Sequence, residues 1–143
     1  MKFLYHTDGK YGKFLPLIFE ELGADGLNPI ERNNCNDIFE IRKEYPHKML
    51  FGNVCCIHTL PHGTLGDVED ETLELIEKIG PQAGIFIGSS SEVHDAVPVK
   101  NAAKMYQTVH AYGTFPIDVE RIRARRTELR MQGELELRAG LAL

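Results

Sequence analysis

The feature that most constrains this chain is a fourfold alternation of short apolar segments with helical patterns. The apolar segments cover residues 2–6, 26–30, 48–54 and 83–88, and glycine, proline or polar residues bound each of them. Short runs that are apolar on both faces are typical of strands in a parallel sheet. Because parallel strands need long, right-handed crossovers, the alternation predicts an α/β fold with one parallel sheet.

Helical spacing of apolar residues follows each of these segments. The helices that we predict between and after the strands cover residues 10–22, 37–45, about 64–79 and 99–112. Pro16 lies inside the first of them, so we expect that helix to begin near Pro16 or to bend there. Thr64 or Asp67 can start the third. The chain is therefore expected to form four βα units over residues 1–116 and a terminal helix over residues 117–143.

The predicted terminal helix carries charges of both signs. Its arginines are interspersed with acidic residues from Asp118 to Arg138. Such a mixture is typical of a solvent-exposed helix with i,i+4 ion pairs rather than of a nucleic-acid-binding patch.

The composition fits one globular domain and excludes several functional classes. The chain has 143 residues, of which 43% are hydrophobic and 26% charged, and its net charge is −5. The negative charge argues against non-specific nucleic-acid binding, and no apolar run is long enough to cross a membrane. The start lacks the apolar stretch of a signal peptide, and three cysteines, two of them adjacent, make a poor disulfide framework. We therefore expect a cytoplasmic protein that binds neither nucleic acid nor a membrane.

Polar side chains follow each of the four apolar segments, at the place where ligands bind in parallel βα folds. The residues that we predict to contact a small-molecule substrate there are Asn28, Glu31, Arg32, Asn53, Ser90, Ser91 and His94. No spacing among them is specific by itself, and the informative observation is that polar residues meet at all four strand ends.

His6 and Asp8, at the end of the first segment, are the candidate catalytic pair. Residues two apart on a strand point to the same side. Asp8 could orient the imidazole for proton transfer, or the pair could bind a metal ion. Alternatively, Asp8 begins a turn with Gly9, and His6 only covers the core. The residues alone leave these interpretations open.

Cys55, Cys56 and His58, with His62 four residues further on, offer thiolates and imidazoles, which are the usual ligands of zinc. Their spacing matches no standard zinc motif, and adjacent cysteines near a strand end are more often small buried residues. We therefore predict no bound metal.

Several motifs stand in order along the chain. They are His6-Thr7-Asp8-Gly9, the stretch from Glu21 to Glu31, Asn36-Asp37-Ile38, Gly52-Asn53-Val54, residues 84–91, Pro98-Val99-Lys100-Asn101 and Tyr112-Gly113. Together they resemble the C-terminal half of the uroporphyrinogen decarboxylase family, over about residues 2–115. The resemblance implies half of a closed (β/α)8 barrel, in which this chain supplies strands five to eight.

One branch of that family removes carboxyl groups from the acetate side chains of uroporphyrinogen in porphyrin biosynthesis, without a metal or organic cofactor. By this resemblance the chain is a decarboxylase-like lyase with His6 and Asp8 as its catalytic candidates, and no cofactor is implied. A tetrapyrrole with many carboxylates needs several arginines in its pocket, and the strand ends here offer little beyond Arg32 and Lys10. We therefore expect the chain to carry only part of an active site.

Another branch has the same fold but uses zinc to activate a thiol for methyl transfer from a corrinoid protein. By resemblance, that branch needs His-x-Cys after the fifth strand and a further Cys after the eighth. Here Asp8 occupies the first thiolate position and the second falls at about Ser91, so a zinc-dependent methyltransferase-like protein is the weaker alternative.

A half barrel leaves two strand edges and an apolar inner face without partners. The chain is therefore expected to form a homodimer or to pair with a complementary N-terminal half barrel. A further alternative is an inactive half-barrel subunit that depends on a partner.

Overall fold

The four apolar segments form one sheet in the computed structural model. The structure describes residues 1–32 and 36–140, so that Cys35 and the last three residues of the predicted terminal helix lie outside the described part. The strands are β1 (Leu4–His6), β2 (Gly26–Asn28), β3 (Met49–Phe51) and β4 (Ile85–Phe86), in the order β1-β2-β3-β4. Every neighbouring pair is parallel, which confirms the predicted sheet, although each strand is shorter than its apolar segment.

Helices follow the strands along the chain. They are α1 (Ile38–Glu44), α2 (Thr59–His62), α3 (Leu65–Lys78), α4 (Val99–Tyr112) and α5 (Val119–Gly140). Helix α3 begins with a capping box, in which the Thr64 hydroxyl accepts from the Asp67 N–H and the Asp67 carboxylate accepts from the Thr64 N–H. Helix α2 was not predicted, because one turn is too short to show a helical period.

The predicted helix over residues 10–22 is not continuous. The structure has a 3₁₀ turn, η1 (Gly12–Phe14), and a wider π-type turn, η2 (Leu17–Glu21), on either side of Pro16. Proline has no N–H to donate, so a regular α-helical ladder is interrupted there. Ile18 and Phe19 nevertheless bury the apolar side of this segment.

The sheet is covered on one face and open on the other. Leu27 and Leu50 point to the covered face and are fully buried in the main core. On the opposite face, Leu4 and Phe86 remain 44% and 55% exposed. In a closed (β/α)8 barrel, helices cover the outside of the sheet and side chains of the other face fill the interior. The fold is therefore half of such a barrel, with its interior face open.

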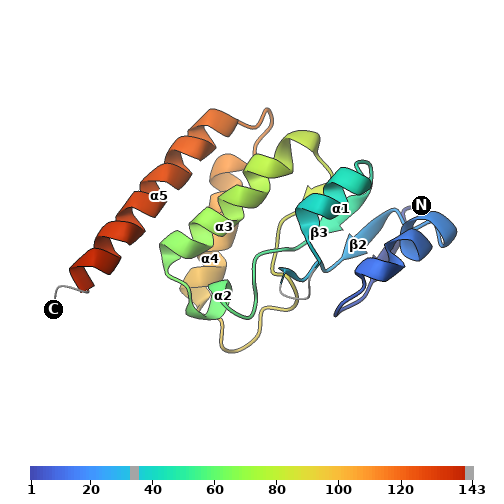
Figure 1. Cartoon of the computed structure of the whole chain (residues 1–143), viewed down its shortest axis with the longest axis horizontal. Coiled ribbons are helices and arrows are strands. Elements are labelled where there is room, and N and C mark those ends of the chain that lie inside the picture. The colour runs from blue at the N-terminus through green and yellow to red at the C-terminus, as the bar shows by residue number, and fades with distance from the viewer. Residues whose placement is uncertain (33–35, 141–143) are drawn as a thin grey trace.

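Helix α5 is mostly exposed, as predicted, but it also packs on α3, which was not predicted. Figure 1 shows α5 as the outermost element, beside α3. Ile122 of α5 is fully buried in a second apolar cluster with Leu73 and Ile76 of α3. Arg126 bonds to Asp70 of α3 at 2.7 Å, whereas the ion pairs within α5 are of the i,i+3 type. The predicted i,i+4 pairs are absent from the described part of α5 because the acidic residues of α3 bind its arginines.

Within the described ranges, none of the helices combines the length and apolarity that crossing a membrane requires. The predicted cytoplasmic location stays a prediction, and so does the division of the chain at residue 116.

Candidate functional site

The open face of the sheet ends in a small polar cluster around His6, the last residue of β1. Asn28, the last residue of β2, stands opposite His6 in the register of the sheet, and its Nδ2 lies 3.3 Å from His6 Nδ1. On the other side of the ring, His6 Nε2 lies 3.8 Å from a carboxylate oxygen of Asp8. The structure therefore brings together three predicted residues from two strand ends.

The contacts of His6 define how its ring carries a proton. Because the Asn28 amide nitrogen can only donate, His6 Nδ1 must accept, and the proton of the neutral ring is then on Nε2. This N–H faces the Asp8 carboxylate. Both side chains remain more than half exposed, at 67% and 60%, so that a substrate on the open face could reach them. This geometry suits proton transfer.

The turn after β1 is held by Glu31 and Tyr11 rather than by Asp8. Gly9 has a φ of +86° and donates its N–H to a carboxylate oxygen of Glu31 at 2.8 Å. The Tyr11 hydroxyl donates to the carbonyl of Pro29 at 2.9 Å. Burial, together with the nearby charges of Glu31 and Asp8, raises the pKa of Tyr11, which keeps it protonated as a donor. The predicted substrate residue Glu31 thus connects the first two strand ends.

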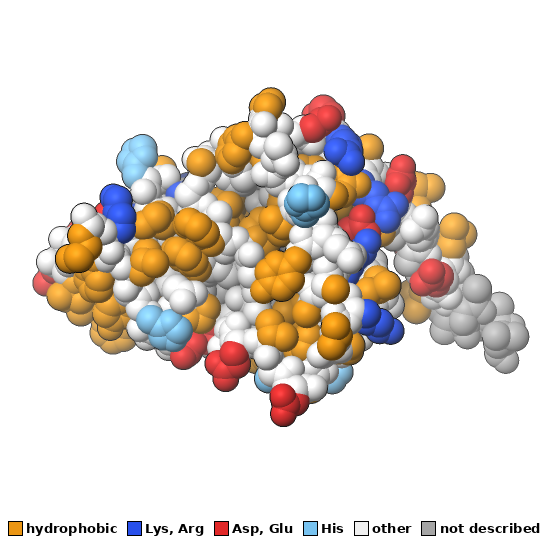
Figure 2. All heavy atoms as spheres, turned by 180° about the vertical axis from the view of Figure 1, so that it is seen from behind, with side chains coloured by type: hydrophobic (Ala, Val, Ile, Leu, Met, Phe, Trp, Pro, Cys, Tyr) orange, Lys and Arg blue, Asp and Glu red, His pale blue; other side chains and the backbone are white. Residues whose placement is uncertain are grey.

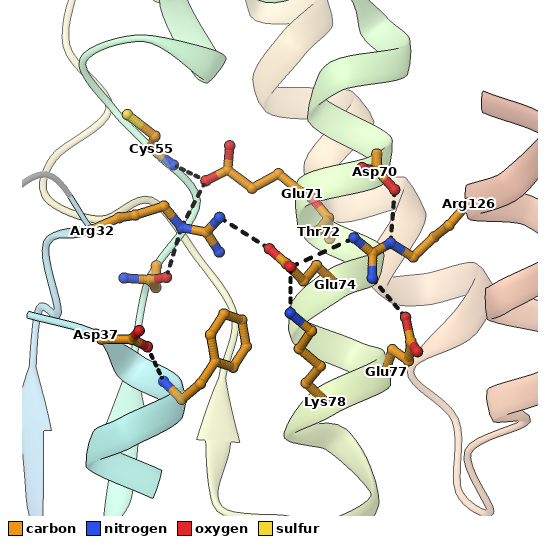
Figure 3. A network of polar contacts seen from close by, with 12 residues as sticks. Arg32, Asp37, Cys55, Asp70, Glu71, Thr72, Glu74, Glu77, Lys78 and Arg126 are labelled. Carbon is orange, nitrogen blue, oxygen red and sulfur yellow. Dashed lines mark hydrogen bonds and ion pairs between the residues drawn. The ribbon is translucent and has the colours of Figure 1, made fainter. Parts of the chain in front are cut away.

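Arg32 and Asn53 form a second group that points toward α3, as Figure 3 shows for Arg32. Asn53 is fully buried, donates to the Ile30 carbonyl at 2.8 Å and accepts from Arg32 Nε at 3.2 Å. Arg32 also bonds to Glu74 at 3.1 Å and pairs with Glu71 at 3.4 Å. Two carboxylates therefore share the charge of this arginine.

One donor of Arg32 has no acceptor. Its Nη2 is buried and has no hydrogen-bond partner among the described residues. Arg32 lines a cavity of about 400 Å³ together with Phe39, Asn53 and Glu74. Because Nη2 itself is closed off, an acceptor in this cavity could bind it only after the side chain moves.

Glu71 and Glu74 are site residues that the sequence prediction missed. Burial raises the pKa of Glu74, but hydrogen bonds from Lys78 and Arg32 outweigh this and hold its pKa below the usual value. Glu74 also lies 3.6 Å from Arg126 of α5, so that one carboxylate connects the loop after β2 with the outermost helix (Figure 3). Its position on the same α3 face as Asp70 and Glu77, at intervals of four and three residues, was the available signal.

Ser90 and His94 connect the loops after β3 and β4. The Cys56 N–H donates to Ser90 Oγ at 3.1 Å, and Ser90 Oγ donates to Cys56 Sγ at 3.3 Å. His94 Nε2 donates to the Cys56 carbonyl at 2.9 Å. Ser91 is half-buried beside them. Ser90 is only 2% exposed, so that a substrate could not reach it without a movement of these loops.

The zinc site of the methyltransferase alternative does not fit these residues. Cys55 Sγ accepts the His58 N–H at 3.2 Å, and Cys56 Sγ accepts from Ser90. Within residues 1–32 and 36–140, no three His, Cys, Asp or Glu side chains converge as a metal ion would require.

Comparison with known proteins agrees with the half-barrel fold. A family model described as "Uroporphyrinogen decarboxylase (URO-D)" matches residues 1–112, from the start of the chain to the end of α4. The chain belongs to the uroporphyrinogen decarboxylase family. Comparison with curated proteins and with solved structures gives no match. The suspected family and the half-barrel fold are confirmed, and α5 lies beyond the matched residues.

Proposed function

We propose that this chain contributes one side of a decarboxylase site that acts on a carboxylate-bearing tetrapyrrole such as uroporphyrinogen. Membership of the family supports this reaction class. The observation that carries the proposal is the cluster of His6, Asp8 and Asn28 on the open face, at the carboxyl end of the strands. Ligands of (β/α)8 enzymes bind at that end.

The reaction needs a proton donor. When the bond between the side-chain carbon and its carboxylate breaks, CO₂ leaves and the electron pair stays on carbon. A proton must then be delivered to that carbon. His6 and Asp8 can pass a proton from solvent to that carbon, and Asn28 holds the imidazole ring from the other side. None of these roles uses a metal ion or an organic cofactor.

The cations that bind the substrate's other carboxylates must come from outside the described site. Arg32 is shared between Glu71 and Glu74, so that it cannot also bind an exposed propionate or acetate at full strength. The proposal therefore assigns to this chain the proton-handling residues, and part rather than all of the substrate contacts.

The assay is turnover of uroporphyrinogen by the chain at concentrations where it has assembled, with products separated by the number of remaining carboxyl groups. His6→Gln should lower the rate at least about a hundredfold, because it removes the proton donor. His47→Gln is the matched control, since His47 is exposed and precedes β3 at the opposite end of the sheet. Equal turnover by wild type and His6→Gln would contradict the proposal.

A further inference from the structure

The four strands all end at one level of the sheet, in a row of side chains on the same face. The register pairs His6 with Asn28 and Phe51 with Phe86, and the pairing of β2 with β3, continued by one residue, sets Asn28 level with Phe51. These four are the last residues of β1, β2, β3 and β4. The row therefore faces the barrel interior at the carboxyl end of the strands, whichever polypeptide supplies the rest of the barrel.

The aromatic half of this row is a stacked pair. The rings of Phe51 and Phe86 lie within 3° of parallel, and their centroids are 4.4 Å apart. Each ring therefore turns one π face to the other. Because β2 and β4 lie on opposite sides of β3, the second π face of Phe51 is on the side of β2, toward Asn28 and His6. An aromatic face that a second ring holds in place is suited to stacking with another flat ring.

Strand β2 leaves room for such a ring. On this face it carries only two small residues, Asn28 at the level of the row and Gly26 one level below. A Cβ on Gly26 would lie 2.8 Å from Leu4 Cδ2 and 2.8 Å from Met49 Cβ, so that these two side chains form an apolar floor over Gly26. Above this floor, β1 and β3 are about 9.5 Å apart, which is two strand spacings. This separation admits one flat ring between their side chains.

The row is polar on β1 and β2 and aromatic on β3 and β4. Figure 2, seen from behind, shows hydrophobic side chains gathered over the N-terminal part at left and again near the centre, with histidine side chains beside them. Such a division suits a ligand that is flat and apolar on one side and carries a carboxylate on the other. A methyl donor without a ring would leave the π face of Phe51 unused.

We infer that the free π face of Phe51 binds a heteroaromatic ring of the substrate, and that Phe86 positions Phe51 by stacking on it. A ring that lies there over β2 has one edge beside the His6 imidazole, so that a carboxymethyl group on this edge reaches the proton-handling cluster. The substrate class is a flat nitrogen heteroaromatic ring with a carboxymethyl group, as in the pyrrole rings of uroporphyrinogen. The inference rests on the proposed function for the reaction, but binding of the ring is measured without turnover.

The probe is pyrrol-3-ylacetic acid, and its binding to the full 143-residue chain is measured by proton NMR. Protons over a π face resonate upfield because of the ring current, so binding at Phe51 should move the pyrrole signals upfield. Phe51→Leu should weaken binding at least about fivefold and abolish the upfield shift, because leucine is apolar but has no π face. Phe86→Leu should reduce the shift less. Cyclopentylacetic acid, which has no aromatic ring, should bind the wild type at least about fivefold more weakly.

Two further variants separate stacking from folding. Phe115→Leu is the matched control, since Phe115 lies between α4 and α5 and is 60% exposed, close to the 55% of Phe86. It should bind the probe as the wild type does. Phe51→Tyr keeps the π face and should keep both the binding and the upfield shift. Circular dichroism verifies that each variant is folded.

The outcomes distinguish ring binding from the reaction. Equal binding of the two acids, no binding of the probe to the wild type, or an unchanged upfield shift in Phe51→Leu would overturn the inference. If the probe binds with the expected shift but uroporphyrinogen is not decarboxylated, ring binding at Phe51 stands and the proposed function fails.

Discussion

At the scale of single residues, Arg126 is a buried cation held by carboxylates of α3. Its side chain is 9% exposed, its Nε donates to Asp70 at 2.7 Å, and its Nη1 donates to Glu77 at 2.6 Å. Burial disfavours its charge, but hydrogen bonds to Asp70 and Glu77 outweigh burial and raise the pKa of Arg126. One planar cation therefore holds carboxylates from two turns of α3.

Replacing this cation measures how much the α3–α5 contact contributes to the free energy of unfolding. Arg126→Met should lower the free energy of unfolding by about 2 kcal/mol, because it leaves Asp70 and Glu77 without their shared partner. Arg130→Met is the matched control: Arg130 is one turn further along, is 61% exposed and lies 3.4 Å from the same Asp70. It should cost less than about 0.5 kcal/mol. Urea unfolding of both variants measures the two free-energy changes. Equal losses of stability would contradict the conclusion that Arg126, and not Arg130, holds α5 on α3.

Gly26 gives a second residue-scale prediction, on the sheet itself. Gly26→Ala should lower the free energy of unfolding by about 2 kcal/mol, because its Cβ would overlap the Met49 carbonyl and side chain. Gly133 of α5 has no atom near the place of a Cβ, so Gly133→Ala should raise stability by about 0.5–1 kcal/mol through helix propensity. Thermal unfolding distinguishes them, and a neutral Gly26→Ala would mean that β1 and β3 can separate around the added methyl group.

At the scale of elements, α5 is attached to α3 as much by charge as by apolar contact. Ile122 is fully buried, and around it Arg125 bonds to Glu69 and Arg123 to Glu77. A hydrogen bond from Arg125 holds the pKa of Glu69 below its usual value. Burial raises the pKa of Glu77, but hydrogen bonds from Arg126 and Arg123 outweigh it, and the pKa is lowered overall.

These lowered pKa values predict how α5 responds to acid. A carboxyl group whose pKa is lower in the folded chain stabilises the fold fully above its unfolded pKa, here 4.5. This stabilisation is lost as the pH falls below 4.5 and through the folded pKa. The free energy of unfolding should therefore decrease below pH 4.5, and the decrease should be shallower in Glu69→Gln/Glu77→Gln. Urea titrations at several pH values measure how steeply the free energy of unfolding falls with pH in both proteins. Identical slopes would show that these ion pairs contribute nothing to the pH dependence of stability.

The elements also show where sequence reasoning succeeds and where it stops. Apolar runs and helical periods predicted the strands and the helix over 99–112, because burial on a strand or helix leaves a local pattern. The pairing of α5 with α3 leaves no such pattern, since it depends on which face of α3 the fold turns outward. Asn53 and Arg32 were placed correctly at strand ends, but the loop backbone, which periodicity does not describe, turns them toward α3.

At the scale of the whole molecule, stability and assembly are linked. The half barrel buries Leu27 and Leu50 on one face and leaves Leu4 and Phe86 on the other partly exposed. A partner that covers the second face binds the folded chain and not the unfolded one, and it therefore stabilises the fold by mass action. For a single chain with a self-sufficient core, the unfolding temperature would not depend on concentration.

The homodimer, one of the two arrangements expected from the sequence, makes a thermal prediction. A tenfold rise in protein concentration should raise the wild-type unfolding midpoint by about 2–4 °C, because it shifts the free energy of dimer unfolding by RT ln 10. Phe86→Asp places a charge on the open face, so its midpoint should be lower and independent of concentration, whereas Leu135→Asp, at a 64% exposed position of α5, should follow the wild type. Scans at one heating rate, followed by circular dichroism, measure all three. A wild-type midpoint that stays constant while the chain remains folded would mean that the open face is stable in water without a partner.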